Sequence, residues 1–442
     1  GKHSIKGLLG YSQIYNQYRI LEATRKDLPS NNSLGEINAG DENTQTTQGN
    51  LVEYALRSAF ARVNYVYDDR YLFEANVRYD GTSRFPKNNR FGAFPSFSLG
   101  WRLSEEEFFD IPWIDNLKLR ASWGLLGNQE IGDYAFYNTY VFGENYNFGN
   151  VLVPGISINS NMANTNITWE KTDQLDAGVD MDLLGGKLNF TGDFFLKNTK
   201  DILLRLPIAD IVGCTAPMQN AGEVRNIGVE FQLNHNNQIN DFNYFATFNF
   251  SYIHNEITNL SGGDTPGRSV GDPIANIYGY VCEGIYNTQE EIDNHAKQTW
   301  GAKPGDLIYK DINSDGIVDE EDRVSLGSYF PKINFGLRLG FEYKNFDFSA
   351  LMQGAGMVNA IVNEINKAFY NGGKVTEEHL DRWTPDNPDA SYFRLSMKDS
   401  QKNWMNSSFW MQNSSYLKMR NIQLGYTIPK TLLSDYGISR LR

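Results

Sequence analysis

Residues 333–344 read "INFGLRLGFEYK", and apolar side chains alternate with polar or small ones at every position. The odd positions hold the apolar set: Ile333, Phe335, Leu337, Leu339, Phe341 and Tyr343. The even positions hold the other set: Asn334, Gly336, Arg338, Gly340, Glu342 and Lys344. Because successive side chains of a strand point to opposite faces, this period of two predicts a β-strand with one apolar and one polar face.

The same alternation recurs along the chain. It is clearest in "YLFEANVRYD" (71–80), "QLDAGVDMDL" (174–183), "KLNFTGDFFLK" (187–197) and "NIGVEFQLN" (226–234). Strands are expected near 2–23, 54–67, 70–82, 91–103, 117–126, 170–184, 187–200, 224–236, 242–257, 332–344, 346–356 and 414–427, with another starting at 438. This pattern predicts an all-β chain, and it suits a soluble sandwich or a membrane barrel.

Composition narrows the class of protein. The 442 residues include 25 Tyr, 27 Phe and 40 Gly, which favours one large β structure over several ordinary domains. The net charge of -13 argues against nucleic acid as a partner, because phosphate-binding surfaces are basic. The five histidines fall in no metal-binding spacing and no nucleophile motif is visible, so an enzyme is not expected. Cys214 and Cys282 are far apart in sequence and in no metal-like spacing, and two free thiols or one disulfide are both possible.

The lengths of the connections separate a sandwich from a barrel. Tight turns at 68–70, 184–187, 236–241 and 344–347, with a moderate one at 104–116, alternate with long excursions at 24–53, 127–169, 204–223, 258–331 and 357–413. Outer-membrane barrels have short periplasmic turns and long extracellular loops. The sequence therefore predicts a multi-pass transmembrane antiparallel β-barrel over 1–442, in contact with outer-membrane lipid, with 258–331 and 357–413 as extracellular loops. Twelve strands and the start of a thirteenth do not close an even-numbered barrel, so the remaining strands are expected from further polypeptide.

One excursion contains "DINSDGIVDEED" (311–322), which follows the spacing of a calcium loop. The predicted ligands are Asp311, Asn313, Asp315, the carbonyl of Ile317, Asp319 and Asp322, with Gly316 at the turn. Asp322 replaces the longer Glu of calcium sensors, and neither flank predicts a helix. A structural calcium ion is therefore predicted; the alternative is an acidic loop of Asx turns that binds no ion.

Several segments together resemble one family. They are "ARVNYVYDDRYLFEANVRYDGTSRF" (61–85), "FGAFPSFSLGWRLSEEEFF" (91–109), "LKLRASWGLLGNQ" (117–129), "GDLIYKDINSDGIVDEEDRVSLG" (305–327) and "YLKMRNIQLGYTIP" (416–429). This set resembles the C-terminal barrel portion of the SusC/RagA family of TonB-linked outer-membrane transporters of Gram-negative bacteria. The resemblance implies a barrel of about 22 strands, a preceding plug domain that we do not find in this sequence, a SusD-like surface lipoprotein and the TonB complex acting through the plug.

The function expected from the resemblance is nutrient uptake as part of a TonB-dependent importer of oligosaccharides or peptides. The alternative is a structural or docking barrel in an envelope complex without transport activity of its own. Aromatic residues in the long excursions are candidates for contact with substrate or partner, although they could equally pack the loops together. These candidates are Tyr146, Phe148, Trp300, Trp383, Trp404 and Trp410.

Overall fold

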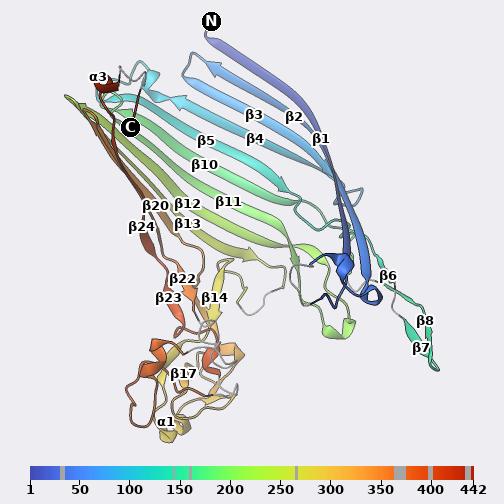
Figure 1. The fold of residues 1–442 in the computed structure, drawn as a ribbon. Coiled ribbons are helices and arrows are strands. Elements are labelled where there is room, and N and C mark those ends of the chain that lie inside the picture. Colours follow the sequence, from blue (N-terminus) through green and yellow to red (C-terminus); the bar gives the residue numbers. More distant parts are fainter. Residues whose placement is uncertain are drawn as a thin grey trace. The chain divides into compact units, whose positions relative to one another are not determined.

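The computed structural model describes residues 1–29, 35–142, 145–158, 162–263, 267–362, 375–396, 402–433 and 440–442. Long strands form a 12-stranded sheet, in the order β1-β2-β3-β4-β5-β10-β11-β12-β13-β20-β21-β24 (Figure 1). Their bounds are β1 His3–Thr24, β2 Thr46–Tyr67, β3 Tyr71–Thr82, β4 Phe91–Arg102, β5 Ile114–Asn128, β10 Glu170–Leu183, β11 Leu188–Arg205, β12 Met218–Ile239, β13 Phe242–Asn259, β20 Ile333–Tyr343, β21 Phe346–Gly356 and β24 Tyr416–Tyr426. Sheet neighbours are sequence neighbours among the long strands, as expected for a meander.

Shorter elements lie in the connections. The strands are β6 Tyr140–Phe142, β7 Tyr146–Phe148, β8 Val151–Val153, β9 Ile156–Ile158, β14 Asn276–Gly279, β15 Cys282–Ile285, β16 Lys297–Gln298, β17 Leu307–Tyr309, β18 Ile317–Val318, β19 Val324–Ser328, β22 Asn359–Ile361 and β23 Met411–Asn413. Within the described residues, the α-helices are α1 Gln289–Asn294 and α3 Lys430–Leu433. No helix in the described part of the chain is long and apolar enough to span a membrane.

The alternating segment at 333–344 forms β20, as its pattern predicts. β20 pairs antiparallel with both β13 and β21. Its apolar face meets apolar partners in β21: Leu337 lies opposite Met352, and Phe341 stacks on Phe348 with ring centroids 5.4 Å apart. Cross-strand pairs of this kind are the unit of sheet stabilisation, so the alternation that predicts the strand also sets its register.

The twelve predicted strands are all present, but three extend at least five residues further toward the long connections than predicted. β2 begins at Thr46 instead of 54, β11 runs to Arg205 instead of 200, and β12 begins at Met218 instead of 224. β1 and β2 pair continuously from His3 opposite Tyr67 to Thr24 opposite Thr46, so part of the predicted excursion at 24–53 is strand. The backbone pairing continues where the apolar alternation has stopped. The strand predicted to start at 438 begins outside the described residues.

The chain divides into two compact units, each with its own core. Unit 1 comprises 1–99, 122–174 and 199–222, and unit 2 comprises 100–121, 175–198 and 223–442. The core of unit 1 consists of Phe85, Phe94, Ile131, Phe136, Ile167 and Trp169.

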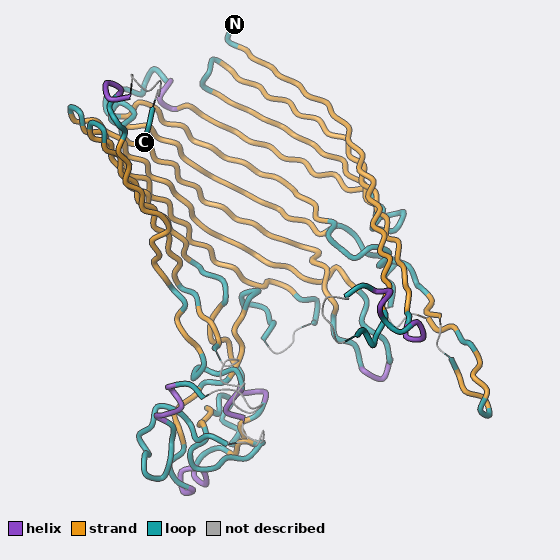
Figure 2. The backbone as a smooth tube through the Cα atoms, viewed as in Figure 1, coloured by secondary structure: helices purple, strands orange, loops and turns teal. Residues whose placement is uncertain are grey.

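In unit 2 the predicted loops 258–331 and 357–413 contain a folded body, which we call the loop domain (described residues of 276–328 and 375–413). Figure 2 shows it as loops, short strands and single helical turns. The segment 276–328 contains three two-stranded sheets: β14 with β19, β15 with β17, and β16 with β18. Its core consists of Tyr280, Leu307, Tyr309, Val318, Tyr392, Phe393, Trp404 and Trp410, drawn from both segments.

Candidate functional site

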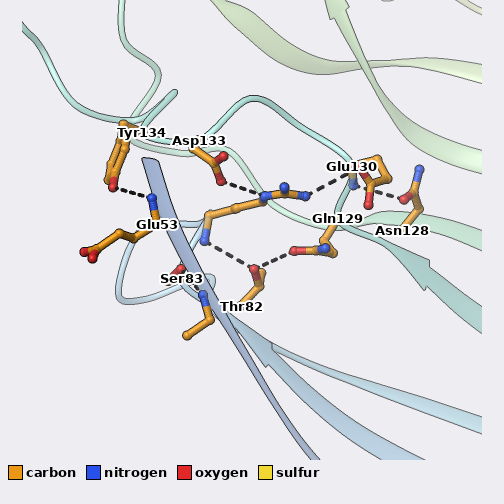
Figure 3. Close-up of polar contacts among 10 residues, drawn as sticks. Glu53, Thr82, Ser83, Asn128, Gln129, Glu130, Asp133 and Tyr134 are labelled. Carbon is orange, nitrogen blue, oxygen red and sulfur yellow. Dashed lines mark hydrogen bonds and ion pairs between the residues drawn. The ribbon is translucent and has the colours of Figure 1, made fainter. Parts of the chain in front are cut away.

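A group of polar side chains gathers in unit 1 where β2 and β3 meet the connection that follows β5 (Figure 3). Its centre is Arg84, two residues after β3 ends. The Arg84 Nε donates to Asp133 Oδ1 at 2.8 Å, and its guanidinium lies over the Tyr54 ring at 4.2 Å from the centroid. Both members of the ion pair are largely shielded, with 12% of the Arg84 and 18% of the Asp133 side chain exposed. Shielding strengthens the pair relative to one on an open surface.

Two further bonds tie the same connection to the same strands. Thr82 Oγ1 donates to Gln129 Oε1 at 2.6 Å, and the Glu53 backbone N–H donates to the Tyr134 hydroxyl at 3.1 Å (Figure 3). Residues 129–134 are therefore bonded to β2, to β3 and to Arg84, which follows β3. We call this set the Arg84 cluster. Its hydrogen bonds and its ion pair hold residues 129–134 against the neighbouring strands.

The Arg84 cluster has no signature in the sequence. Arg84 and Asp133 stand 49 residues apart, and Thr82 and Gln129 stand 47 apart. Neither pair falls in a recognisable motif. Only the fold brings these residues together. In the core of the same unit, Trp169 meets Phe85 and Phe94 edge to face, with ring centroids 5.3 and 5.2 Å apart.

Two of the predicted contact residues are on a projecting hairpin of unit 1. Tyr146 and Phe148 belong to β7, which pairs with β8. Their side chains are 65% and 66% exposed, and their ring centroids are 4.7 Å apart. Val151 and Leu152 of β8 are each 63% exposed as well. An apolar surface of this kind is typical of an interaction site.

The other four predicted contact residues help to pack the loop domain. Trp404 and Trp410 are 8% and 3% exposed and stack at 5.7 Å between centroids. Trp300 meets Tyr280 edge to face at 5.6 Å, and Trp383 donates its indole N–H to Asn287 Oδ1 at 2.8 Å. For Trp404 and Trp410 the structure favours packing over contact, because a side chain in the core presents almost no surface to a ligand.

A buried carboxylate joins the two segments of the loop domain. Asp306 is 6% exposed, and its Oδ1 accepts from Arg394 Nε at 2.8 Å and from Asn403 Nδ2 at 3.1 Å. Its Oδ2 accepts from Arg394 Nη2 at 3.1 Å and from the Lys303 backbone N–H at 2.9 Å. Asn403 in turn accepts from the Leu307 N–H, so one network orders both segments.

The predicted calcium motif lies on the surface of this domain. Its turn residue Gly316 has a φ of +88°, the left-handed conformation that the motif requires of a glycine. The carboxylate of Asp311 accepts the backbone N–H groups of Ser314 and Gly316 at 2.7 and 2.9 Å. Asp315 Oδ1 accepts the Ile317 N–H at 2.8 Å, and Asn313 Oδ1 accepts the Asp315 N–H at 3.0 Å. These are the Asx turns of the alternative interpretation.

The last two motif carboxylates also bond to backbone. Asp322 is fully buried; its Oδ1 accepts the Ile312 N–H at 2.7 Å and its Oδ2 the Asp319 N–H at 2.8 Å. Asp319 Oδ1 accepts the Glu321 N–H at 2.9 Å. Among the described residues, no three His, Cys, Asp or Glu side chains are arranged to hold a metal ion. The donor types suit calcium, but in this arrangement the carboxylates order the loop itself.

Burial also raises two pKa values in the loop domain. Desolvation raises the pKa of the Cys282 thiol to about 11 and that of the Tyr286 hydroxyl to about 12. Both groups therefore stay neutral at physiological pH. Cys282 and the exposed Cys214 are both free thiols.

Comparison with known proteins agrees with this architecture. The family model described as "TonB dependent receptor-like, beta-barrel" matches residues 3–437. The TonB-dependent receptor P3 of Formosa agariphila is 30% identical over 100% of this chain and 45% of its own length. The TonB-dependent receptor SusC of Bacteroides thetaiotaomicron is 32% identical over 88% of this chain and 39% of its own length.

A solved structure shows the same fold. The RagAB peptide transporter superposes with a TM-score of 0.82 at 25% identity, covering 98% of this chain and 48% of that chain. The chain thus spans less than half the length of each relative named here. The matched relatives are receptors and transporters, and the shared fold is part of an antiparallel transmembrane β-barrel.

Proposed function

Because the chain belongs to the TonB dependent receptor-like β-barrel family, we propose that it forms the C-terminal portion of the barrel in a TonB-dependent importer. The family is one of the outer membrane, which this chain crosses with strands. The proposed cargo is oligosaccharide or peptide. The RagAB relative is named as a peptide transporter. The SusC relative is named as a TonB-dependent receptor.

The observation that carries this proposal is the polar face of β2 and β3. On it Arg62 donates to Asn76 Oδ1 at 2.6 Å, and Asn76 donates to Glu74 Oε1 at 2.8 Å. Further along β3, Arg78 pairs with Asp80 at 3.1 Å. A connected polar lining opposite an apolar face is what a water-filled or plugged lumen requires.

We propose three partners in addition to lipid. The remaining strands of the barrel and a plug domain would complete the protein, and the TonB complex would act through that plug. A SusD-like surface lipoprotein would cover the extracellular mouth. Support for this last partner comes from the exposed β7–β8 hairpin, whose apolar side chains have the character of a protein interface.

Copurification tests the function and the lipoprotein together. The protein is purified from its host in mild detergent, and intact-complex mass spectrometry identifies the attached polypeptides and any enclosed oligosaccharide or peptide. We expect a surface lipoprotein and a bound oligomer. A complex with envelope proteins but neither of these would contradict the proposal and support a docking barrel.

The hairpin supplies a matched pair of variants for this experiment. Tyr146→Ser with Phe148→Ser removes two exposed rings, and lipoprotein recovery is expected to fall. Ile211→Ser removes an apolar side chain that is 95% exposed elsewhere in unit 1, and recovery should not change. Equal loss in both variants would show that the hairpin is not the contact.

We also propose a structural calcium ion at 311–322. The donor residues and their spacing support it, and the exposed rim of the motif gives solvent access to Asn313 and Asp315. Binding would require Asp311 and Asp315 to reorient or to share their oxygens with the backbone N–H groups that they now accept. Asp322 would remain the buried anchor of the loop.

The calcium proposal predicts a response to chelation. Removing calcium should increase hydrogen exchange in residues 311–322, and Asp311→Ala with Asp315→Ala should remove the difference between the calcium-loaded and chelated protein. Heat-modifiable migration of the barrel serves as the control for folding. Identical exchange with and without calcium in the unmodified protein would leave the Asx-turn loop as the correct interpretation.

A further inference from the structure

One face of β1, β2 and β3 carries an unbroken run of apolar rows that is interrupted at one row of the sheet. In register, this run ends with Tyr11, Ala59 and Tyr79, and Tyr15 and Ala55 follow beyond the interruption. The next row outward on the same face is Gln13, Arg57 and Gly81. An aromatic row followed at once by a cation is the sequence of side chains found where hydrocarbon meets lipid headgroups.

The position of Arg57 along β2 agrees with a membrane boundary. It stands ten residues from Tyr67, where β2 ends at a tight turn. Ten residues of strand extend about 33 Å, and a strand tilted by about 40° then rises about 25 Å, the height of the apolar band of such barrels. Because the turn at 68–70 is on the short-turn side, Arg57 lies at the outer, extracellular boundary.

A second arginine reaches this boundary from the connection between β3 and β4. That connection is short, and the Thr82 backbone N–H donates to the Arg90 carbonyl at 3.1 Å. Phe91 then folds over Gly81, where any Cβ would collide with its ring, and stacks on Tyr79 at 5.3 Å between centroids. Arg90 and Phe91 therefore sit beside the row that contains Arg57.

Between these side chains is a recess of about 230 Å³. Arg57, Arg90, Gln13, Ser83 and Phe91 are among the residues that line it. Arg90 Nε is shielded from solvent and has no hydrogen-bond partner, and no acidic side chain of the described part pairs with either guanidinium. The nearest acid on the same face of β2 is Glu53, which instead accepts from Tyr15 and Gln17 at 2.6 and 2.7 Å.

We propose that Arg57 and Arg90 bind the phosphorylated headgroup of an outer-leaflet lipid, whose acyl chains lie along the apolar face of β1 to β3. A guanidinium presents a planar fork of donors that matches phosphate oxygens, and two of them at a boundary of low dielectric favour an anion strongly. The adjoining apolar face selects a lipid over free phosphate, because only a lipid also covers Tyr11 and Tyr79. The inference depends on the membrane-spanning fold and is independent of what the barrel transports.

The test measures lipid retained by the purified protein. Arg57→Gln with Arg90→Gln keeps both side chains polar and of similar length, so folding should be preserved, which heat-modifiable migration checks. Native mass spectrometry in mild detergent is expected to show at least about a tenfold loss of bound phosphorylated lipid, because charge-assisted bonds to phosphate are lost at both positions. Arg19→Gln is the matched control, since this exposed residue shares the face of β1 that carries Gln13 but lies further from the apolar band.

Three results would overturn the proposal. The double variant could retain as much lipid as the unmodified protein, or Arg19→Gln could lose as much as the double variant, which would indicate a diffuse charge effect. The third result comes from a separate experiment, in which delipidated protein is mixed with lipid A in phosphatidylcholine nanodiscs and inorganic phosphate is added as a competitor. Displacement of the lipid by phosphate alone at comparable concentration would show a phosphate site instead of a lipid site.

Discussion

Asp306→Asn is expected to unfold the loop domain while the long strands of the sheet stay paired. The substitution keeps the size of the side chain but removes the charge that faces Arg394, at a site where Asp306 is 6% exposed. Breaking one partner of a buried ion pair costs about 3–5 kcal/mol, because the remaining charge is left in a poorly solvated position. A loss of this size is a large fraction of the total stability of a small domain.

Hydrogen exchange of the intact detergent-solubilised protein measures this effect. Protection should be lost across 276–328 and 375–396 together, since Asp306 and Asn403 connect both segments. Glu320→Gln is the control, because Glu320 is 78% exposed in its pair with Arg323 and exposed pairs contribute little. Retained protection in Asp306→Asn would show that the aromatic core alone holds the domain.

Phe85→Ala is expected to release the connection that follows β5. Phe85 is fully buried and packs edge to face on Trp169. Truncating a buried Phe to Ala costs about 3–5 kcal/mol through lost burial and the cavity left behind. The Arg84 cluster lies in the same part of unit 1, so residues 129–137 should become sensitive to protease.

Limited proteolysis with mass mapping of the fragments reads out this release. Phe108→Ala provides the control, because Phe108 is 72% exposed and its removal leaves no cavity. Cleavage within 129–137 in Phe85→Ala, with the strands intact, is the expected pattern. An unchanged digestion pattern would mean that the Arg84 cluster holds the connection without the core beneath it.

The strands themselves could be predicted because their signal is local. Side-chain direction in a strand repeats every two residues, so a sheet with one apolar face leaves its mark within ten residues, as in 333–344. Connection lengths then indicate a membrane barrel. The alternation of apolar side chains does not predict the part of β2 that continues back to Thr46. Outside a membrane, a strand needs backbone pairing but no apolar face.

The aromatic residues show the limit of reading exposure from position in a loop. Six were predicted as contact candidates because they lie in long excursions. Tyr146 and Phe148 are exposed, whereas Trp404 and Trp410 belong to a core whose described residues come from both 276–328 and 375–413. A loop of this length can bury its own tryptophans, and nothing in its local sequence distinguishes the two outcomes.

The amino-acid sequence by itself determined the strands, their alternation of lipid and polar faces, the family and the calcium-type spacing at 311–322. Tertiary structure decided which residues meet: Arg84 with Asp133, Asp306 with Arg394, and Arg57 with Arg90 around one recess. The physical reason is that periodicity is a property of neighbouring residues, while an ion pair or a recess depends on register between segments far apart in the chain. For the motif, the spacing supplied the donors, and only the fold showed that Asp322 is buried and bonded to its own backbone.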